Sequence, residues 1–116
     1  RIRQDFTKVR PLIIGEYGYG SVPMENPEKQ NKRYGSGNDA TEARQLEIYK
    51  GIFEGSEAAR IAGVYNWTFF EFTAKNINRY ERTFGILRPD GSVKPSGQLL
   101  RKTYIRWAEE YRSPWN

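Results

Sequence analysis

The sequence predicts an α/β domain in which βα units build a parallel sheet. Two apolar runs, at residues 11–18 and 64–70, lack the polar and apolar alternation of a sheet with one wet face, so they are typical of strands buried on both faces. Segments with helical spacing of apolar residues lie between the two runs and after the second. This alternation favours parallel pairing, and we expect the 116 residues to form one domain.

Composition narrows the class of protein. Hydrophobic residues make up 37% and charged residues 28%, which is unlike a disordered tail, and no run approaches the 18 apolar residues of a membrane span. The chain has no Cys and no His, which excludes disulfides, the usual zinc sites and Ser-His-Asp triads within it. We expect no metal and no other cofactor.

The net charge of +5 is mild and carries little functional signal. The basic residues near the C-terminus share their segment with acids, which predicts a solvated helix face and favours neither a nucleic-acid partner nor a membrane. The residues concerned are Arg101, Lys102, Arg106 and Arg112, with Glu109 and Glu110.

Three segments precede the first complete helix. Ile2, Phe6 and Val9 have the spacing of the end of an amphipathic helix, and residues 11–18 form the first predicted strand. A polar segment rich in Gly and Pro runs from residue 18 to 38, beyond the roughly 12 to 15 residues of ordinary loops, so we expect it to be functional or disordered.

The first complete helix is expected to begin with an acidic variant of the capping box. Asp39 stands three residues before Glu42, which predicts Asp39 as the N-cap. An apolar stripe follows until Gly55 and the residue after it interrupt the pattern, and residues 58–62 are predicted to add one further turn.

The second half repeats this order. Gly63 separates the helix from the second predicted strand, and a long connection from residue 71 to 94 contains a turn signal at 89–91. Pro95 suits the first turn of a final helix. The apolar stripe of that helix consists of Leu100, Tyr104, Trp107, Ala108 and Tyr111.

Candidate functional residues stand at the C-terminal ends of the two predicted strands, where α/β proteins place their sites. Glu16 stands at the end of an apolar strand, where an unpaired carboxylate is costly to bury. It is therefore a catalytic candidate, or else it points into solvent or pairs with an Arg from a neighbouring loop. Trp67 offers a flat platform for a sugar or a base, or else belongs to the core. Glu71 is a second acid, or an exposed loop residue. The aromatic residues that line such a cleft or pack on the sheet are Tyr17, Tyr19, Phe69, Phe70 and Tyr80.

Three segments in order resemble clan A glycoside hydrolases. Residues 10–18, an apolar run followed by Glu, an aromatic residue and Gly, look like the seventh strand of these enzymes. Residues 63–72 are similar to the eighth strand, with its Trp, and residues 84–95 resemble the tail, with an Asp-Gly turn and Lys-Pro. The likeness is to family 5, the cellulases and mannanases, with the family 2 β-glycosidases as the alternative.

The resemblance implies a (β/α)₈ barrel, of which this chain supplies strands 7 and 8, and a retaining mechanism on a carbohydrate substrate. It implies Glu16 as the catalytic nucleophile and Trp67 as the platform beneath the sugar. Tyr17 and Glu71 are the further predicted substrate-binding residues. At the position of Glu71 the family usually has Asp. It also favours a secreted or extracellular enzyme of polysaccharide degradation.

The acid/base Glu of the clan follows an Asn, and no Asn-Glu pair occurs in the sequence. Two βα units cannot close a barrel. We therefore expect the C-terminal part of a glycosidase, inactive alone, whose partner is the remainder of the barrel as a separate or cleaved chain. The alternative is a non-catalytic partial-barrel module or self-associating fragment, and a nucleic-acid binder ranks third.

Overall fold

A computed structural model describes residues 11–21, 41–72, 76 and 81–110. The predicted α/β class is confirmed, since the described residues form two parallel strands and two long helices in βα order, and the sheet is not closed. The elements are β1 (Ile13–Tyr17), α3 (Glu42–Ala58), β2 (Gly63–Asn66), the short 3₁₀ helix η1 (Glu81–Thr83) and α4 (Pro95–Glu110). The expectations for residues 1–10 and 22–40 lie outside the described residues.

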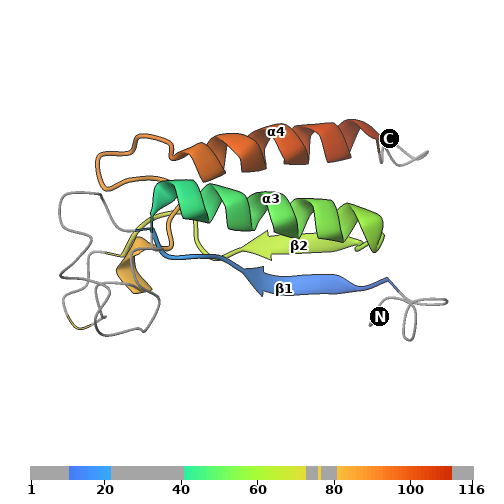
Figure 1. The fold of residues 1–116 in the computed structure, drawn as a ribbon, viewed down its shortest axis with the longest axis horizontal. Coiled ribbons are helices and arrows are strands. Elements are labelled where there is room, and N and C mark those ends of the chain that lie inside the picture. The colour runs from blue at the N-terminus through green and yellow to red at the C-terminus, as the bar shows by residue number, and fades with distance from the viewer. Residues whose placement is uncertain (1–10, 22–40, 73–75, 77–80, 111–116) are drawn as a thin grey trace.

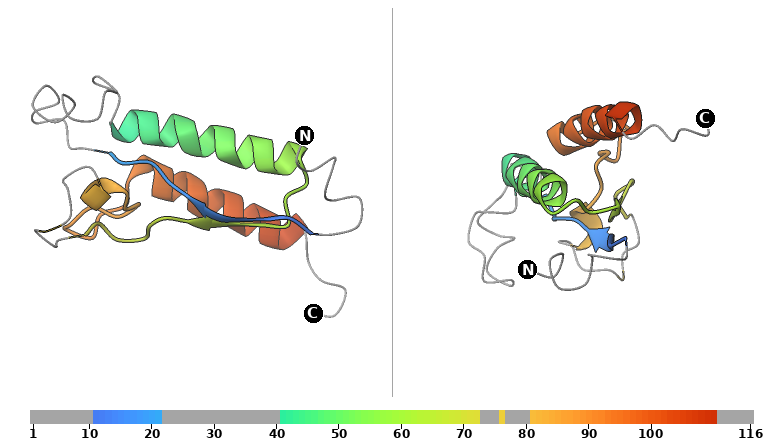
Figure 2. Two further views of the ribbon diagram at one scale, coloured as in Figure 1. Left: turned by 90° about the horizontal axis from the view of Figure 1, so that it is seen from below. Right: turned by 90° about the vertical axis from the view of Figure 1, so that its right-hand side faces the viewer.

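Both helices cover the same face of the sheet. Figure 1 shows α3 above β1 and β2 with α4 alongside it, and the end-on view in Figure 2 places the two helices on one side of the strands. The helices also pack against each other. No described helix lies on the other face, so the sheet has one packed face and one helix-free face.

An aromatic cluster joins the strands to the helices. The ring of Tyr17 from β1 meets Tyr49 and Phe53 from α3 edge to face, with centroid distances of 5.2 and 5.7 Å. Phe53 in turn contacts Tyr104 and Trp107 of α4 at 6.0 and 5.6 Å. Such edge-to-face contacts add to the free energy gained by burying the rings, so this cluster is the core of the domain.

The N-cap of α3 differs from the prediction. Thr41 is the N-cap, because its hydroxyl accepts a hydrogen bond from the backbone N–H of Arg44 at 3.0 Å, and the helix begins at Glu42. Asp39 was predicted for this role and is two residues too early. The Thr41 side chain satisfies a backbone donor of the first turn, which is the function of an N-cap.

The predicted interruption of α3 at Gly55 is wrong. The helix continues to Ala58, and the Ser56 carbonyl then accepts the backbone N–H of Ile61 as the chain leaves the helix. A glycine inside a helix costs only about 1 kcal/mol relative to alanine. The packing of Phe53, two residues earlier in the helix, against both β1 and α4 outweighs that cost.

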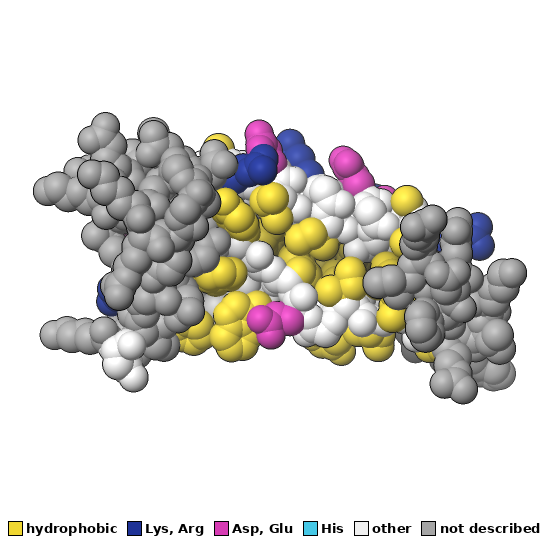
Figure 3. Space-filling model, turned by 60° about the horizontal axis from the view of Figure 1, so that its bottom comes forward, with side chains coloured by type: hydrophobic (Ala, Val, Ile, Leu, Met, Phe, Trp, Pro, Cys, Tyr) yellow, Lys and Arg dark blue, Asp and Glu magenta, His cyan; other side chains and the backbone are white. Residues whose placement is uncertain are grey.

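Both strands are less buried than predicted. Ile13 and Tyr65 are 53% and 64% exposed, because no described element covers the helix-free face. The strand β2 ends at Asn66, short of residue 70, and Phe70 instead forms an isolated bridge with Leu87. Figure 3 shows hydrophobic side chains gathered across this face of the molecule.

The final helix begins at Pro95, as predicted. Its basic residues are exposed, and Arg106 forms ion pairs with Glu57 and Glu110, which agrees with the predicted solvated face. None of the helices in the described part of the chain is both long enough and apolar enough to cross a membrane.

The aromatic cluster yields a prediction about stability. Phe53 is 3% exposed, so Phe53→Ala should lower the free energy of unfolding by about 3–5 kcal/mol, through lost burial and an unfilled cavity. Urea denaturation measures the change. The control Ile105→Ala, at a 46% exposed position of α4, should change it far less, and equal losses would contradict the assignment of Phe53 to the core.

Candidate active site

Glu16 and Trp67 lie at the same end of two neighbouring strands. Glu16 is the penultimate residue of β1, and Trp67 directly follows β2. The backbone N–H of Trp67 donates to the Tyr17 carbonyl at 2.6 Å, which fixes the two strand ends side by side. Because the strands are parallel, their C-terminal ends meet at one edge, as the sequence predicted.

The register of the sheet changes beside Glu16. Ile14 pairs with Val64 and Tyr17 pairs with Asn66, so β1 has one more residue than β2 over this stretch. Such a bulge bends the strand and changes the direction in which a side chain points. Glu16 is one of the residues inside the irregular stretch, and it is exposed. Within the described part of the chain, its carboxylate has no hydrogen-bond or ion-pair partner.

Tyr17 lies on the packed face, unlike its neighbour Glu16. It is 7% exposed, and its hydroxyl is 2.9 Å from that of Tyr104. The Tyr104 hydroxyl donates to the Val64 carbonyl at 3.1 Å, so its single proton is used there and Tyr17 is the donor to Tyr104. Burial raises the pKa of Tyr17, which keeps its hydroxyl protonated. Tyr17 is thus placed to hold the end of β1 against the two helices. The substrate contact predicted for Tyr17 stays a prediction.

A series of hydrogen bonds from α3 holds the segment that carries Trp67. The Tyr49 hydroxyl donates to Oδ1 of Asn66, and Nδ2 of Asn66 donates to the Thr68 carbonyl at 2.8 Å. The peptide bond between Trp67 and Thr68 is cis. Helix α3 therefore fixes the backbone on both sides of Trp67.

Trp67 remains 43% exposed in this arrangement. Its ring contacts Phe72 at a centroid distance of 5.7 Å, with the planes tilted by 46°. A partly exposed indole and an exposed carboxylate thus stand at the ends of two neighbouring strands. This combination suits a sugar, which has apolar ring faces and polar edges.

Glu71 is buried in an ion pair. Its Oε1 lies 2.6 Å from Nζ of Lys94, and the two side chains are 9% and 1% exposed. The Lys94 ammonium also donates to the Ser21 hydroxyl at 2.8 Å and to the Thr83 carbonyl at 3.2 Å. Burial lowers the pKa of Lys94, while the Glu71 carboxylate acts in the opposite direction. The predicted substrate contact of Glu71 stays a prediction, but its carboxylate already has a partner within the chain.

Gln45 is a further buried polar residue near the strand ends. Its Nε2 donates to the Tyr19 carbonyl at 2.7 Å, and its Oε1 accepts from the Ser96 hydroxyl at 2.6 Å. One side chain of α3 thereby fixes both the chain after β1 and the start of α4. Sequence reasoning missed this role, and it noted Lys94 only within a Lys-Pro pair. A buried Gln or Lys has no local signature that separates it from a surface residue.

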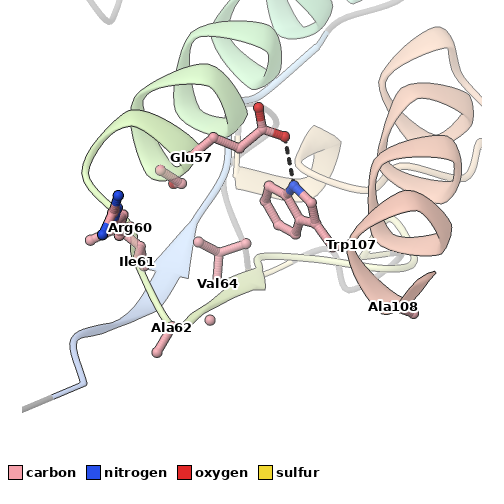
Figure 4. A pocket seen from close by; sticks show the side chains of 9 residues that line it. Glu57, Arg60, Ile61, Ala62, Val64, Trp107 and Ala108 are labelled. Carbon is pink, nitrogen blue, oxygen red and sulfur yellow. Dashed lines mark hydrogen bonds between the residues drawn. The ribbon is translucent and has the colours of Figure 1, made fainter. Parts of the chain in front are cut away.

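A cavity of about 750 Å³ lies at the opposite end of β2 from Trp67. It is lined by the end of α3, the start of β2 and part of α4 (Figure 4). The Trp107 indole donates a hydrogen bond to the Glu57 carboxylate there at 2.6 Å. This hydrogen bond, and to a smaller extent the one from Arg106, lowers the pKa of Glu57. None of the predicted site residues lines this cavity.

Among the described residues, no three acidic, Cys or His side chains gather closely enough to hold a metal ion. The chain matches no protein-family model, and no curated protein is significantly similar to it.

The close approach of the two strand ends makes Gly18 hard to replace. A Cβ atom at Gly18 would overlap the carbonyl oxygen of Trp67 and lie 3.1 Å from the Phe84 ring, so Gly18→Ala should destabilise the protein by about 1–3 kcal/mol. Thermal unfolding tests this. Gly15→Ala is the matched control, because no atom lies within 4 Å of its Cβ position, and similar losses from both variants would contradict the explanation.

The buried ion pair should show strong coupling. Glu71→Gln leaves the Lys94 ammonium buried without its counter-charge, and Lys94→Met leaves the Glu71 carboxylate buried in the same way. Each variant should lower the free energy of unfolding by about 3–5 kcal/mol. The double variant should cost clearly less than the sum, because neither charge remains. Urea denaturation of the four proteins measures the coupling, and additive losses would show that the two charges do not interact.

Proposed function

We propose that this chain is the nucleophile-bearing C-terminal part of a retaining glycoside hydrolase of clan A, with β1 and β2 as strands 7 and 8 of a (β/α)₈ barrel. The single observation that carries the proposal is the placement of Glu16 beside Trp67. An exposed carboxylate and a partly exposed indole stand at the C-terminal ends of adjacent parallel strands. The resemblance assigns these two residues to the nucleophile and the sugar platform.

The open sheet supports the barrel. Parallel sheets occur almost only where both faces are covered, and here one face has no cover from the described residues. Ile13, Tyr65 and Trp67 are exposed on or next to the two strands. Further strands would pair with the outer edges of β1 and β2 and enclose these side chains. The proposed partner is therefore the remainder of the barrel, as a separate or cleaved chain.

The proposed reaction is a double displacement. The Glu16 carboxylate attacks the anomeric carbon, and the bond to the leaving oxygen breaks as that oxygen takes a proton from a second carboxylic acid. Water, deprotonated by the same second group, then attacks the anomeric carbon and releases Glu16. In retaining enzymes the two carboxyl groups are about 5–5.5 Å apart. The second group would come from the part of the barrel outside these 116 residues.

A second candidate is self-association without catalysis, which the exposed apolar face favours. In that case the protein purified from its source is a homo-oligomer of one chain. In the first case it contains a further polypeptide segment of roughly 200 residues or more, the rest of a barrel. Native mass combined with a denaturing gel and intact mass separates the two.

The nucleophile can be tested by covalent trapping. We expect 2-deoxy-2-fluoro-β-glucosyl or β-mannosyl fluoride to label the complete protein on Glu16, because the C2 fluorine slows hydrolysis of the glycosyl ester while fluoride leaves readily. Peptide mass spectrometry locates the label. Glu16→Gln should abolish labelling and lower hydrolysis of aryl glycosides by several orders of magnitude.

Glu54→Gln, at an exposed position of α3, is the matched control and should label like the wild type. Labelling of another residue, or near-normal hydrolysis by Glu16→Gln, would contradict the assignment.

A further inference from the structure

The cavity at the start of β2 is bordered by three elements. The end of α3, the chain that enters β2 and the last turns of α4 form its walls (Figure 4). Its volume of about 750 Å³ is in the range of pockets that hold small organic molecules. The cavity is therefore large enough for a ligand, and the chemistry of its walls decides which kind of ligand it favours.

Most of the cavity wall is apolar. Ile61, Val64 and the indole of Trp107 supply its large apolar groups. The indole is held in place, because its N–H donates to the Glu57 carboxylate at 2.6 Å and its ring stacks on Tyr104 at a centroid distance of 5.6 Å. A wall that is already ordered loses little conformational entropy when a ligand binds. The cavity thus favours a ligand with an apolar body.

Two charged side chains line the cavity, and they differ in their partners. The Glu57 carboxylate accepts hydrogen bonds from Trp107 and from Arg106, with which it also forms an ion pair. The Arg60 guanidinium is exposed and, within the part of the chain that the structure describes, forms no hydrogen bond or ion pair. The charge left for a ligand is thus positive, and a guanidinium can bind a carboxylate through two parallel hydrogen bonds.

The backbone of Arg60 is unusual for an arginine. Arg60 follows α3 in the left-handed conformation, with a φ of 53°. Its N–H donates to the Glu57 carbonyl at 3.0 Å, and the Ile61 N–H donates to the Ser56 carbonyl at 2.9 Å, which is the pattern of a Schellman motif. Glycine is the usual residue at this position, because a Cβ atom is disfavoured there. The arginine therefore makes this helix end less stable than a glycine would, and such strain is typical of functional positions.

We propose that this cavity binds a small organic anion, a carboxylate whose aromatic or aliphatic body lies against Trp107 and Val64 and whose charged group pairs with Arg60. The apolar wall and the one unpaired cation are complementary to the two halves of such a molecule. The cavity lies at the opposite end of β2 from Trp67, so its occupation does not depend on Glu16 acting as a nucleophile.

Binding of naphthalene-2-carboxylate to the complete protein tests the proposal. Isothermal titration calorimetry measures the Kd, and the uncharged naphthalene-2-carboxamide is the matched ligand. We expect the Kd of the carboxylate to be about tenfold lower than that of the amide, because only the carboxylate pairs with the charge of Arg60. Arg60→Gln should remove this preference. Ala108→Phe adds a ring at the cavity wall and should weaken the binding of both ligands.

Arg101→Gln is the matched control, because Arg101 is an exposed arginine of α4 that does not line the cavity. It should bind both ligands like the wild type. Trp67→Ala should do so as well, because Trp67 follows the other end of β2. Arg60→Gly should lose the preference for the carboxylate and yet unfold at a higher temperature, because glycine fits the left-handed position.

Three results would overturn the proposal. The first is no measurable binding of the carboxylate, and the second is equal affinity of the wild type for the carboxylate and the amide. The third is a loss of binding in Trp67→Ala with normal binding in Ala108→Phe, which would place the ligand at the strand ends. A preference for the carboxylate that Arg60→Gln loses and Arg101→Gln keeps supports the proposed site.

Discussion

The attachment of the β1 end to both helices is the constraint on which the rest of the structure depends. Tyr17 packs its ring on α3, and its hydroxyl donates a hydrogen bond to the hydroxyl of Tyr104 in α4. The Tyr104 hydroxyl in turn donates a hydrogen bond to the backbone carbonyl of Val64 in β2. One buried residue therefore connects all four main elements. Its neighbours on either side, Glu16 and Gly18, take their positions from this anchor.

Buried polar groups then fix the loops that follow the strands. The Lys94 ammonium joins the chain after β1, through Ser21, to the chain after β2, through Glu71 and Thr83. Unlike an apolar contact, an ammonium with three oxygen acceptors constrains direction as well as distance, and any missing acceptor leaves a buried charge unsatisfied. This region can hold a fixed geometry although little of it is regular secondary structure.

Sequence patterns predicted the local features and missed the distant ones. The start of α4 follows from a local signal, Pro95 in its first turn. The class of the fold follows from the alternation of strand-like and helix-like segments along the chain. The meeting of Glu16 and Trp67 follows from parallel pairing alone. Thr41 was missed as the N-cap because Asp39, two residues earlier, forms an acidic variant of the capping box with Glu42. The partners of Lys94 and the register change beside Glu16 depend on contacts between distant segments, which no local pattern encodes.

The separation in sequence of these contacts has a consequence for folding. The hydrogen bond between Tyr17 and Tyr104 spans 87 residues, and the one between Lys94 and Ser21 spans 73. Contacts this distant form slowly, because a long loop must close before they stabilise the chain. During synthesis, β1 emerges well before α4, the helix whose Tyr104 is hydrogen-bonded to Tyr17 of that strand. Until α4 has emerged and docked, the end of β1 beside Glu16 lacks the part of its anchor that Tyr104 supplies, so this strand end takes its final position late in folding.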